Sequence, residues 1–161
     1  MKSCVVIYNP NSGHTLKTKH LKEYKTILEK HGYSARFIGT EYRGHAKEII
    51  SHLDKCDLVI SMGGDGTFNE AVTGNLQRKD RLVLAHIPVG TTNDVGVMFG
   101  YGKDIKRNLS LLLNGVTKEM DICIINGQPF VYVAGFGKFM HIPYQTSRTL
   151  KKKWGYLAYL I

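Results

Sequence analysis

Residues 57–72 read DLVISMGGDGTFNEAV, and this stretch decides the expected fold. The apolar run 57–62 is typical of a strand that is buried on both faces of a parallel sheet. A glycine-rich turn follows it directly, and from Gly66 onward Phe68, Ala71 and Val72 recur at helical spacing. A buried strand, a tight turn and a helix in this order indicate part of a βαβ unit.

The same alternation of short strands and amphipathic helices extends to both sides of this stretch. Further strands are predicted at 2–8, 33–39 and 81–87. Further helices are predicted from the spacing of apolar residues at 21–31, 46–53 and 105–113, with a short one after Asp94. The pattern therefore predicts an α/β fold, with a doubly wound, mostly parallel sheet and helices on both faces.

The rhythm changes after the last of these helices. Residues 116–125 and 129–134 predict two antiparallel strands joined by Asn126-Gly127, the strongest short hairpin signal. We therefore expect an α/β domain at 1–119 and the beginning of a second, antiparallel domain at 120–161.

Length, charge and cysteine content narrow the class of protein. The 161 residues suit one ordinary domain with a remnant, and 43% hydrophobic with 22% charged residues is a globular balance. The net charge of +9 favours an anionic partner: a nucleotide, an anionic membrane or a nucleic acid. The apolar run at 4–8 is too short for a signal peptide or a membrane span, which predicts a cytoplasmic protein. Cys4, Cys56 and Cys123 are expected to be reduced, buried thiols rather than disulfide or zinc ligands.

Three polar loops follow the predicted strands, at 9–13, 63–67 and 88–94; each contains glycine, and the second is rich in it. Ligands of a doubly wound sheet bind outside the carboxyl ends of its strands, and glycines let backbone N–H groups approach a polyphosphate closely. The N-terminus of the following helix adds about half a positive charge. The loops together predict a phosphate-binding site. Their hydroxyl donors are Thr67, Thr91 and Thr92.

Asp65 stands out in the second loop, because a bare carboxylate repels phosphate. Its charge is consistent with a magnesium ion between the carboxylate and the phosphates, or with an oriented water molecule. Each loop by itself also has a simpler explanation as a turn or a helix cap. No Walker A sequence is present, and Gly135 and Gly137 lack the third glycine of the dinucleotide motif.

The three loops also carry a family resemblance. In order, Asn9-Pro-Asn-Ser-Gly13, Gly63-Gly-Asp-Gly-Thr-Phe-Asn-Glu70 and Pro88-Val-Gly-Thr-Thr-Asn-Asp94 resemble motifs of the diacylglycerol kinase catalytic domain, which bacterial soluble lipid kinases and sphingosine kinases share. The likeness extends over the whole chain. It implies a fold like the N-terminal domain of NAD kinases and diacylglycerol kinases, followed by the start of a truncated β-sandwich domain.

The resemblance also implies an activity. ATP, with magnesium as cofactor, would phosphorylate the hydroxyl of diacylglycerol, giving phosphatidic acid, or of a related lipid alcohol. The general base and a further metal site would come from the β-sandwich domain beyond Ile161, so the chain alone is expected to bind nucleotide weakly and to transfer little phosphate.

The same resemblance implies the residues of the site. Asp65 would be catalytic, and Asp65, Asp94 and Asp121 would hold magnesium through water. The residues around ATP would be Asn9, Pro10, Asn11, Ser12, Gly13, Thr40, Gly63, Gly64, Asp65, Gly66, Thr67, Phe68, Asn69, Glu70, Gly90, Thr91, Thr92 and Asn93.

Two other functions stay open. An NAD kinase-like enzyme would share the Gly-Gly-Asp-Gly-Thr run, although 68–70 and the loop 88–94 follow the lipid kinase pattern. The second alternative is a non-catalytic module that binds nucleotide and membrane. No nucleic-acid module is recognisable, so nucleic acid is not an expected partner.

The last fifteen residues, 147–161, predict an exposed apolar helix face. Residues 147–161 have a helical pattern that ends on apolar side chains, which predicts an N-terminal piece of a longer protein and, for the piece alone, homodimer formation. This segment also carries a basic cluster beside an aromatic residue: Arg148, the lysines at 151–153 and Trp154. The cluster predicts either a solvated helix face or peripheral contact with an anionic membrane. The histidines are expected at the surface or at helix caps, except His86, which is expected to be a satisfied core residue.

Overall fold

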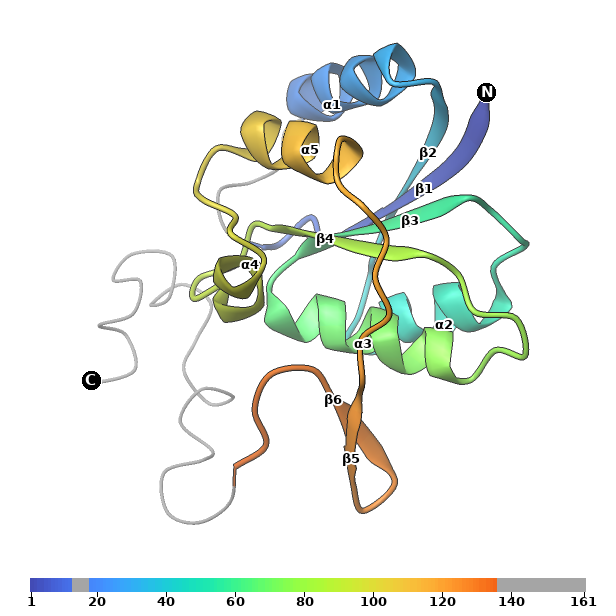
Figure 1. Cartoon of the computed structure of the whole chain (residues 1–161), viewed down its shortest axis with the longest axis vertical. Helices are drawn as coiled ribbons and strands as arrows, with labels where there is room; N and C mark the ends of the chain where they lie inside the picture. Colours follow the sequence, from blue (N-terminus) through green and yellow to red (C-terminus); the bar gives the residue numbers. More distant parts are fainter. Residues whose placement is uncertain (13–17, 136–161) are drawn as a thin grey trace.

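The computed structural model describes residues 1–12 and 18–135, where strands and helices alternate before a final hairpin (Figure 1). The strands are β1 (Lys2–Tyr8), β2 (Tyr33–Gly39), β3 (Leu58–Gly63), β4 (Leu84–Pro88), β5 (Cys123–Ile125) and β6 (Gln128–Phe130). The helices are α1 (Thr18–Lys30), α2 (His45–His52), α3 (Asp65–Leu76), α4 (Asp94–Met98) and α5 (Ile105–Leu113). The predicted helix at 147–161 lies outside the described residues.

Four strands form one parallel sheet in the order β2-β1-β3-β4, which confirms the predicted α/β fold. The register brings the carboxyl ends of the strands together, since Tyr8 is opposite both Gly39 and Met62, and Gly63 is opposite Pro88. The loops that follow β1, β3 and β4 therefore leave the sheet at one edge.

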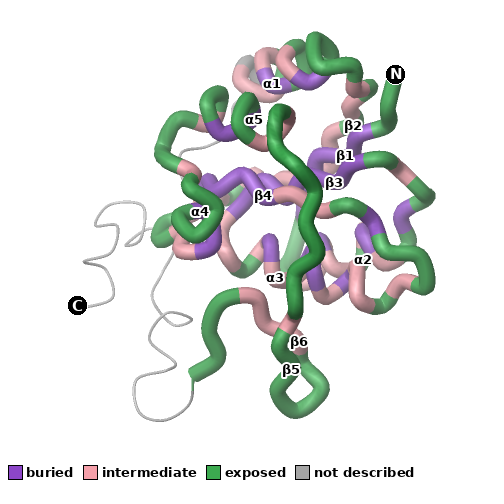
Figure 2. The backbone as a smooth tube through the Cα atoms, viewed as in Figure 1, coloured by how far each residue is buried: buried purple, intermediate pink, exposed green. Residues whose placement is uncertain are grey.

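Helices cover both faces of the sheet: α1 and α5 lie on one side, and α2 and α3 on the other (Figure 1). Side chains alternate along each strand, so Ile60 of β3 joins the core against Leu28 of α1, whereas Val59 joins the core against Ile50 of α2. All six residues of β3 are buried, as the apolar run predicted, and buried residues follow the sheet through the middle of the molecule (Figure 2).

β4 begins at Leu84, three residues later than the apolar pattern of 81–87 predicted. The cause is the side chain of Asn75 in α3. Its Oδ1 accepts a hydrogen bond from the Leu82 backbone N–H at 2.9 Å, and its Nδ2 donates to the Leu82 carbonyl at 3.0 Å. The backbone of Leu82 is therefore paired with a helix side chain and not with β3.

The predicted hairpin is present with Asn126 and Gly127 at its turn, both at positive φ, but its strands are shorter than predicted. The described residues pair only over 123–125 and 128–130. The thiol predictions also need a correction. Cys4 is buried, but Cys56 is only partly buried and Cys123, on an edge of the hairpin, is exposed. All three are free, as predicted.

Candidate functional site

The first polar loop begins where β1 ends, and backbone hydrogen bonds hold it beside its neighbours. The Asn9 N–H donates to the Met62 carbonyl at 3.1 Å, and the Thr40 N–H donates to the Tyr8 carbonyl at 2.8 Å. The Asn9 side chain shapes the loop itself, since its Oδ1 accepts from the Asn11 N–H at 2.9 Å. Of this loop, the predicted site residue Gly13 lies outside the described residues.

The second and third loops touch through their backbones. The Val89 N–H donates to the Gly63 carbonyl at 2.8 Å. A Cβ atom on Gly90 would lie 2.5 Å from Cα of Gly64 and 2.9 Å from Oδ1 of Asn93, so only glycine fits there. The two loops thus approach each other as closely as backbone allows.

Asn93 closes the third loop on itself. Its backbone has left-handed geometry, with φ of 59°, a conformation that asparagine tolerates better than most residues. Its Oδ1 accepts from the Gly90 N–H at 2.6 Å, and its Nδ2 donates to the Gly90 carbonyl at 2.9 Å. The predicted site residue Asn93 therefore acts on the shape of the loop.

Asp65 joins the second loop to the third. One carboxylate oxygen accepts from the Val95 N–H at 3.0 Å; the other accepts from the Asp94 N–H at 3.2 Å and from the Thr92 hydroxyl at 3.1 Å. These two N–H groups belong to the first turn of α4, where a carboxylate satisfies orphan donors and complements the helix dipole. The carboxylate of Asp65 thus caps a helix of the neighbouring loop.

The N-terminus of α3 is open. Its N-cap is Gly64, which has no side chain with which to cap the helix, and the first intrahelical donors are the N–H groups of Thr67 and Phe68. Among the described residues, the N–H groups of Asp65 and Gly66, the first two residues of the helix, have no hydrogen-bond partner. An anion bound between the loops would satisfy them, which fits the phosphates of a nucleotide.

Three predicted site residues at 68–70 make their side-chain contacts inside the protein. Phe68 is buried and stacks on His86, with ring centroids 4.8 Å apart. The Asn69 amide is hydrogen-bonded to the hairpin. Glu70 accepts from the Gly44 N–H at 2.9 Å, and Gly44 is the left-handed N-cap of α2.

The acidic residues predicted to hold magnesium form a pair rather than a triad. Asp65 contacts the backbone of Asp94, whereas Asp121 is exposed near the hairpin. Within residues 1–12 and 18–135 no group of three or more His, Cys, Asp or Glu side chains is placed to hold a metal ion. The carboxylate of Asp94 is an oxygen ligand of the kind magnesium prefers. The metal assignment stays a prediction.

Sequence reasoning missed Gly96 and the surroundings of His86. A Cβ on Gly96 would lie 2.5 Å from Cγ of Pro88, so this glycine lets α4 pack against the end of β4. His86 is buried as predicted, yet it is not satisfied. Its Nδ1 lies 3.1 Å from the Ser61 carbonyl, while its Nε2 and the Ser61 hydroxyl have no partner among the described residues. A glycine inside a helical pattern was the available signal for Gly96.

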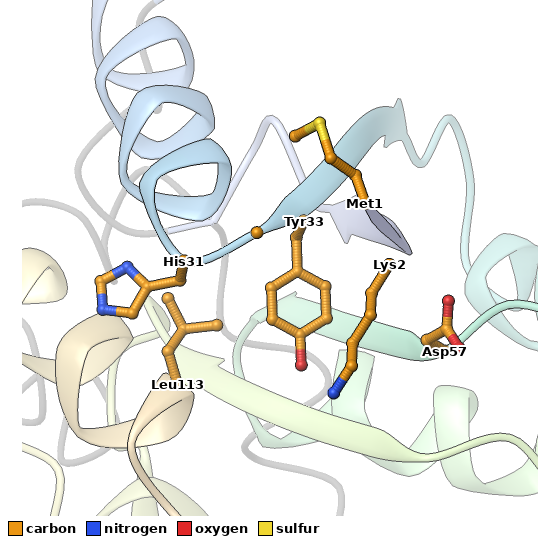
Figure 3. A pocket seen from close by; sticks show the side chains of 7 residues that line it. Met1, Lys2, His31, Tyr33, Asp57 and Leu113 are labelled. Carbon is orange, nitrogen blue, oxygen red and sulfur yellow. The ribbon is translucent and has the colours of Figure 1, made fainter.

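A hollow of about 630 Å³ lies at the amino ends of the strands, on the side of the sheet away from the three polar loops (Figure 3). It is lined by Met1, Lys2, His31, Gly32, Tyr33, Asp57 and Leu113. Asp57 is held by the N–H and the hydroxyl of Ser3, which lower the pKa of its carboxyl group. Helix C-termini, with their negative dipole ends, gather at the amino ends of parallel strands, so this edge suits a phosphate poorly. The loops at the carboxyl edge are the better candidate.

Comparison with known proteins identifies the family to which the chain belongs. Residues 3–125 match the family described as "Diacylglycerol kinase catalytic domain". The chain is 38% identical to a diacylglycerol kinase of Bacillus subtilis (strain 168), over all of this chain and 54% of that protein. It is 37% identical to a diacylglycerol kinase of Staphylococcus epidermidis, over 99% of this chain and 51% of that protein. A crystal structure of a diacylglycerol kinase from Bacillus anthracis (strain Sterne) superposes with a TM-score of 0.68 at 29% identity, covering 80% of this chain and 48% of that one.

The chain belongs to the diacylglycerol kinase catalytic-domain family, because the family match extends over most of its length. It spans about half the length of the curated relatives that it matches. In the described part of the chain, none of the helices is both long and apolar enough to cross a bilayer.

Proposed function

We propose that this chain forms the nucleotide-binding half of an ATP-dependent lipid kinase. The enzyme would transfer the γ-phosphate of ATP to the hydroxyl of diacylglycerol, giving phosphatidic acid, or to a related lipid alcohol. The observation that carries the proposal is the closed junction at the carboxyl edge of the sheet, where Gly64 meets Gly90 and Asp65 caps α4.

The phosphates of ATP would lie against the glycine backbones of the second and third loops. The N-terminus of α3, whose first two N–H groups have no partner in the described part of the chain, would supply donors and the positive end of a dipole. Thr91, whose side chain is exposed at this edge, is a further donor. The first loop, with Asn9 and Ser12, would cover the nucleotide from the side of β1.

Magnesium fits the acidic end of the same junction. When bound, it would neutralise the charge that develops on the phosphates during transfer. Asp94 would hold it directly or through water. Asp65, whose oxygens already accept three hydrogen bonds, would act mainly by holding Asp94 and α4 in place. Phosphoryl transfer depends largely on such positioning.

The acceptor would come from a membrane, with which the protein makes peripheral contact from the cytoplasm. We expect the 161 residues alone to bind nucleotide weakly and to transfer little phosphate, since they span about half of their curated relatives. A turnover rate of the 161-residue chain close to that of the full-length protein would contradict this part of the proposal.

The test is a lipid-phosphorylation assay with the full-length protein and a panel of diacylglycerols, other lipid alcohols and NAD. Asp65→Asn is compared with Asp104→Asn, because Asp104 also caps a helix, α5, through hydrogen bonds from the N–H groups of Lys106 and Arg107. We expect phosphorylation of a lipid, loss of activity in the Asp65 variant and near-normal activity in the Asp104 variant. Phosphorylation of NAD alone would favour the NAD kinase-like alternative, and nucleotide binding without any transfer would favour a non-catalytic module.

A further inference from the structure

The side chain of Asn69 pairs with one edge of the terminal hairpin. Its Oδ1 accepts a hydrogen bond from the Val131 N–H at 3.1 Å, and its Nδ2 lies 3.4 Å from the Pro129 carbonyl, to which it donates. The two partners are two residues apart: Pro129 belongs to β6, and Val131 follows the end of that strand at a bend. The amide therefore pairs with the backbone as a neighbouring strand would, donating to one residue and accepting from the next but one.

Apolar contacts also join the helices to the hairpin region. Phe68 and Val72 of α3 are buried together with Val95 of α4, and Ile122 and Val131 from the hairpin region pack against them. One small cluster thus joins α3, α4 and the hairpin. The amide of Asn69 is itself partly buried, and its removal would leave the Val131 N–H and the Pro129 carbonyl without this partner.

Asn69 and Asp65 are four residues apart in α3, so their side chains leave the helix on the same side, one turn apart. Asp65 holds α4 and the third loop, while Asn69 holds the hairpin. Because one helical turn of α3 connects the two contacts, a shift of the hairpin relative to α3 would change its position relative to the second and third loops.

We propose that Asn69 is a positioning residue, which sets the register of the antiparallel hairpin against the nucleotide loops and does not bind the nucleotide. This inference rests on the proposed kinase function for its kinetic consequence. The hairpin begins the second predicted domain, from which the acceptor side of the reaction is expected to come. Because transfer requires acceptor and phosphate in line, a loosened hairpin lowers kcat while leaving the affinity for nucleotide intact.

The test compares Asn69→Ala and Asn69→Asp with the matched control Asn114→Ala in the full-length protein. Asn114 is the exposed C-cap of α5, and among the described residues its side chain donates only to the Ser110 carbonyl of that helix. Asn69→Asp retains the acceptor for Val131 and places an oxygen against the Pro129 carbonyl, so it separates loss of the contact from loss of side-chain volume.

Three quantities are measured: hydrogen exchange of the Val131 amide by NMR, the Kd for an ATP analogue, and kcat for lipid phosphorylation. For Asn69→Ala we expect exchange at Val131 to accelerate about tenfold, kcat to fall about tenfold and Kd to change by less than about twofold. Asn69→Asp should show the same pattern, and Asn114→Ala should leave all three unchanged.

Two results would overturn the inference. The first is a large rise in Kd with unaltered exchange at Val131, which would make Asn69 a nucleotide ligand. The second is unaltered exchange at Val131 with unaltered kcat. If no lipid is phosphorylated by the unsubstituted protein, the proposed function fails, yet faster exchange at Val131 with an unchanged Kd would still support the positioning role.

Discussion

His86 makes the stability of this protein depend on pH. The side chain is 1% exposed on β4, stacked on Phe68, and its Nε2 has no partner among the described residues. Burial lowers the pKa of His86 from 6.5 to about 4, against smaller opposing effects of the Ser61 carbonyl and of Asp65. The folded protein therefore disfavours the imidazolium form.

The pH dependence of the free energy of unfolding follows from the difference between the folded and unfolded pKa values of His86. In the unfolded chain His86 gains its proton near pH 6.5, whereas in the folded protein it gains it near pH 4. Between these values the unfolded state binds more protons, so acid favours unfolding. The contribution of neutral His86 to the free energy of unfolding is present in full above pH 6.5 and is lost as the pH falls from 6.5 to about 4. At pH 4 the loss amounts to about 3 kcal/mol, since each pKa unit is worth about 1.4 kcal/mol.

The measurement is urea denaturation between pH 7.5 and pH 4, for the unsubstituted protein, for His86→Leu and for the control His31→Gln. His31 is exposed, so this substitution controls for the loss of a histidine from the surface. We expect His86→Leu to lose about 3 kcal/mol less than the unsubstituted protein over this range. Parallel pH profiles for the unsubstituted protein and His86→Leu would refute the assignment of a depressed pKa to this residue.

Three further predictions test the loops, the core and the thiols. Gly90→Ala should weaken ATP binding at least about tenfold in calorimetry, because its Cβ would collide with the facing loop; Gly102→Ala, where nothing lies within 4 Å of the added atom, should not. Leu28→Ala should lower the free energy of unfolding by about 2–5 kcal/mol in urea titrations, since the side chain is fully buried, and a loss below about 1 kcal/mol would contradict the packing described. A thiol reagent at pH 8 should label the exposed Cys123 within minutes and spare Cys4, whose pKa burial raises to about 12; equal labelling rates in the folded protein would be inconsistent with the fold.

Predictions from short-range patterns were confirmed where the deciding interactions are short-range. The run at 57–62 predicted β3 because six consecutive positions without a polar face suit a strand covered on both sides. Asn126-Gly127 predicted the hairpin because both residues adopt the positive φ that its turn requires. The start of β4 was predicted wrongly, because the Asn75 amide competes for the backbone of Leu82 from another element.

The sequence by itself determined the α/β order, the three polar loops and their common edge, since all of these follow from periodicity, turn chemistry and the geometry of parallel strands. The tertiary structure alone decided which partners the site residues have. Asp65 caps a helix 29 residues further on, and Asn69 holds a segment 62 residues away. No local pattern encodes such pairs, because they come into contact only after the sheet has closed and brought separate loops to one edge.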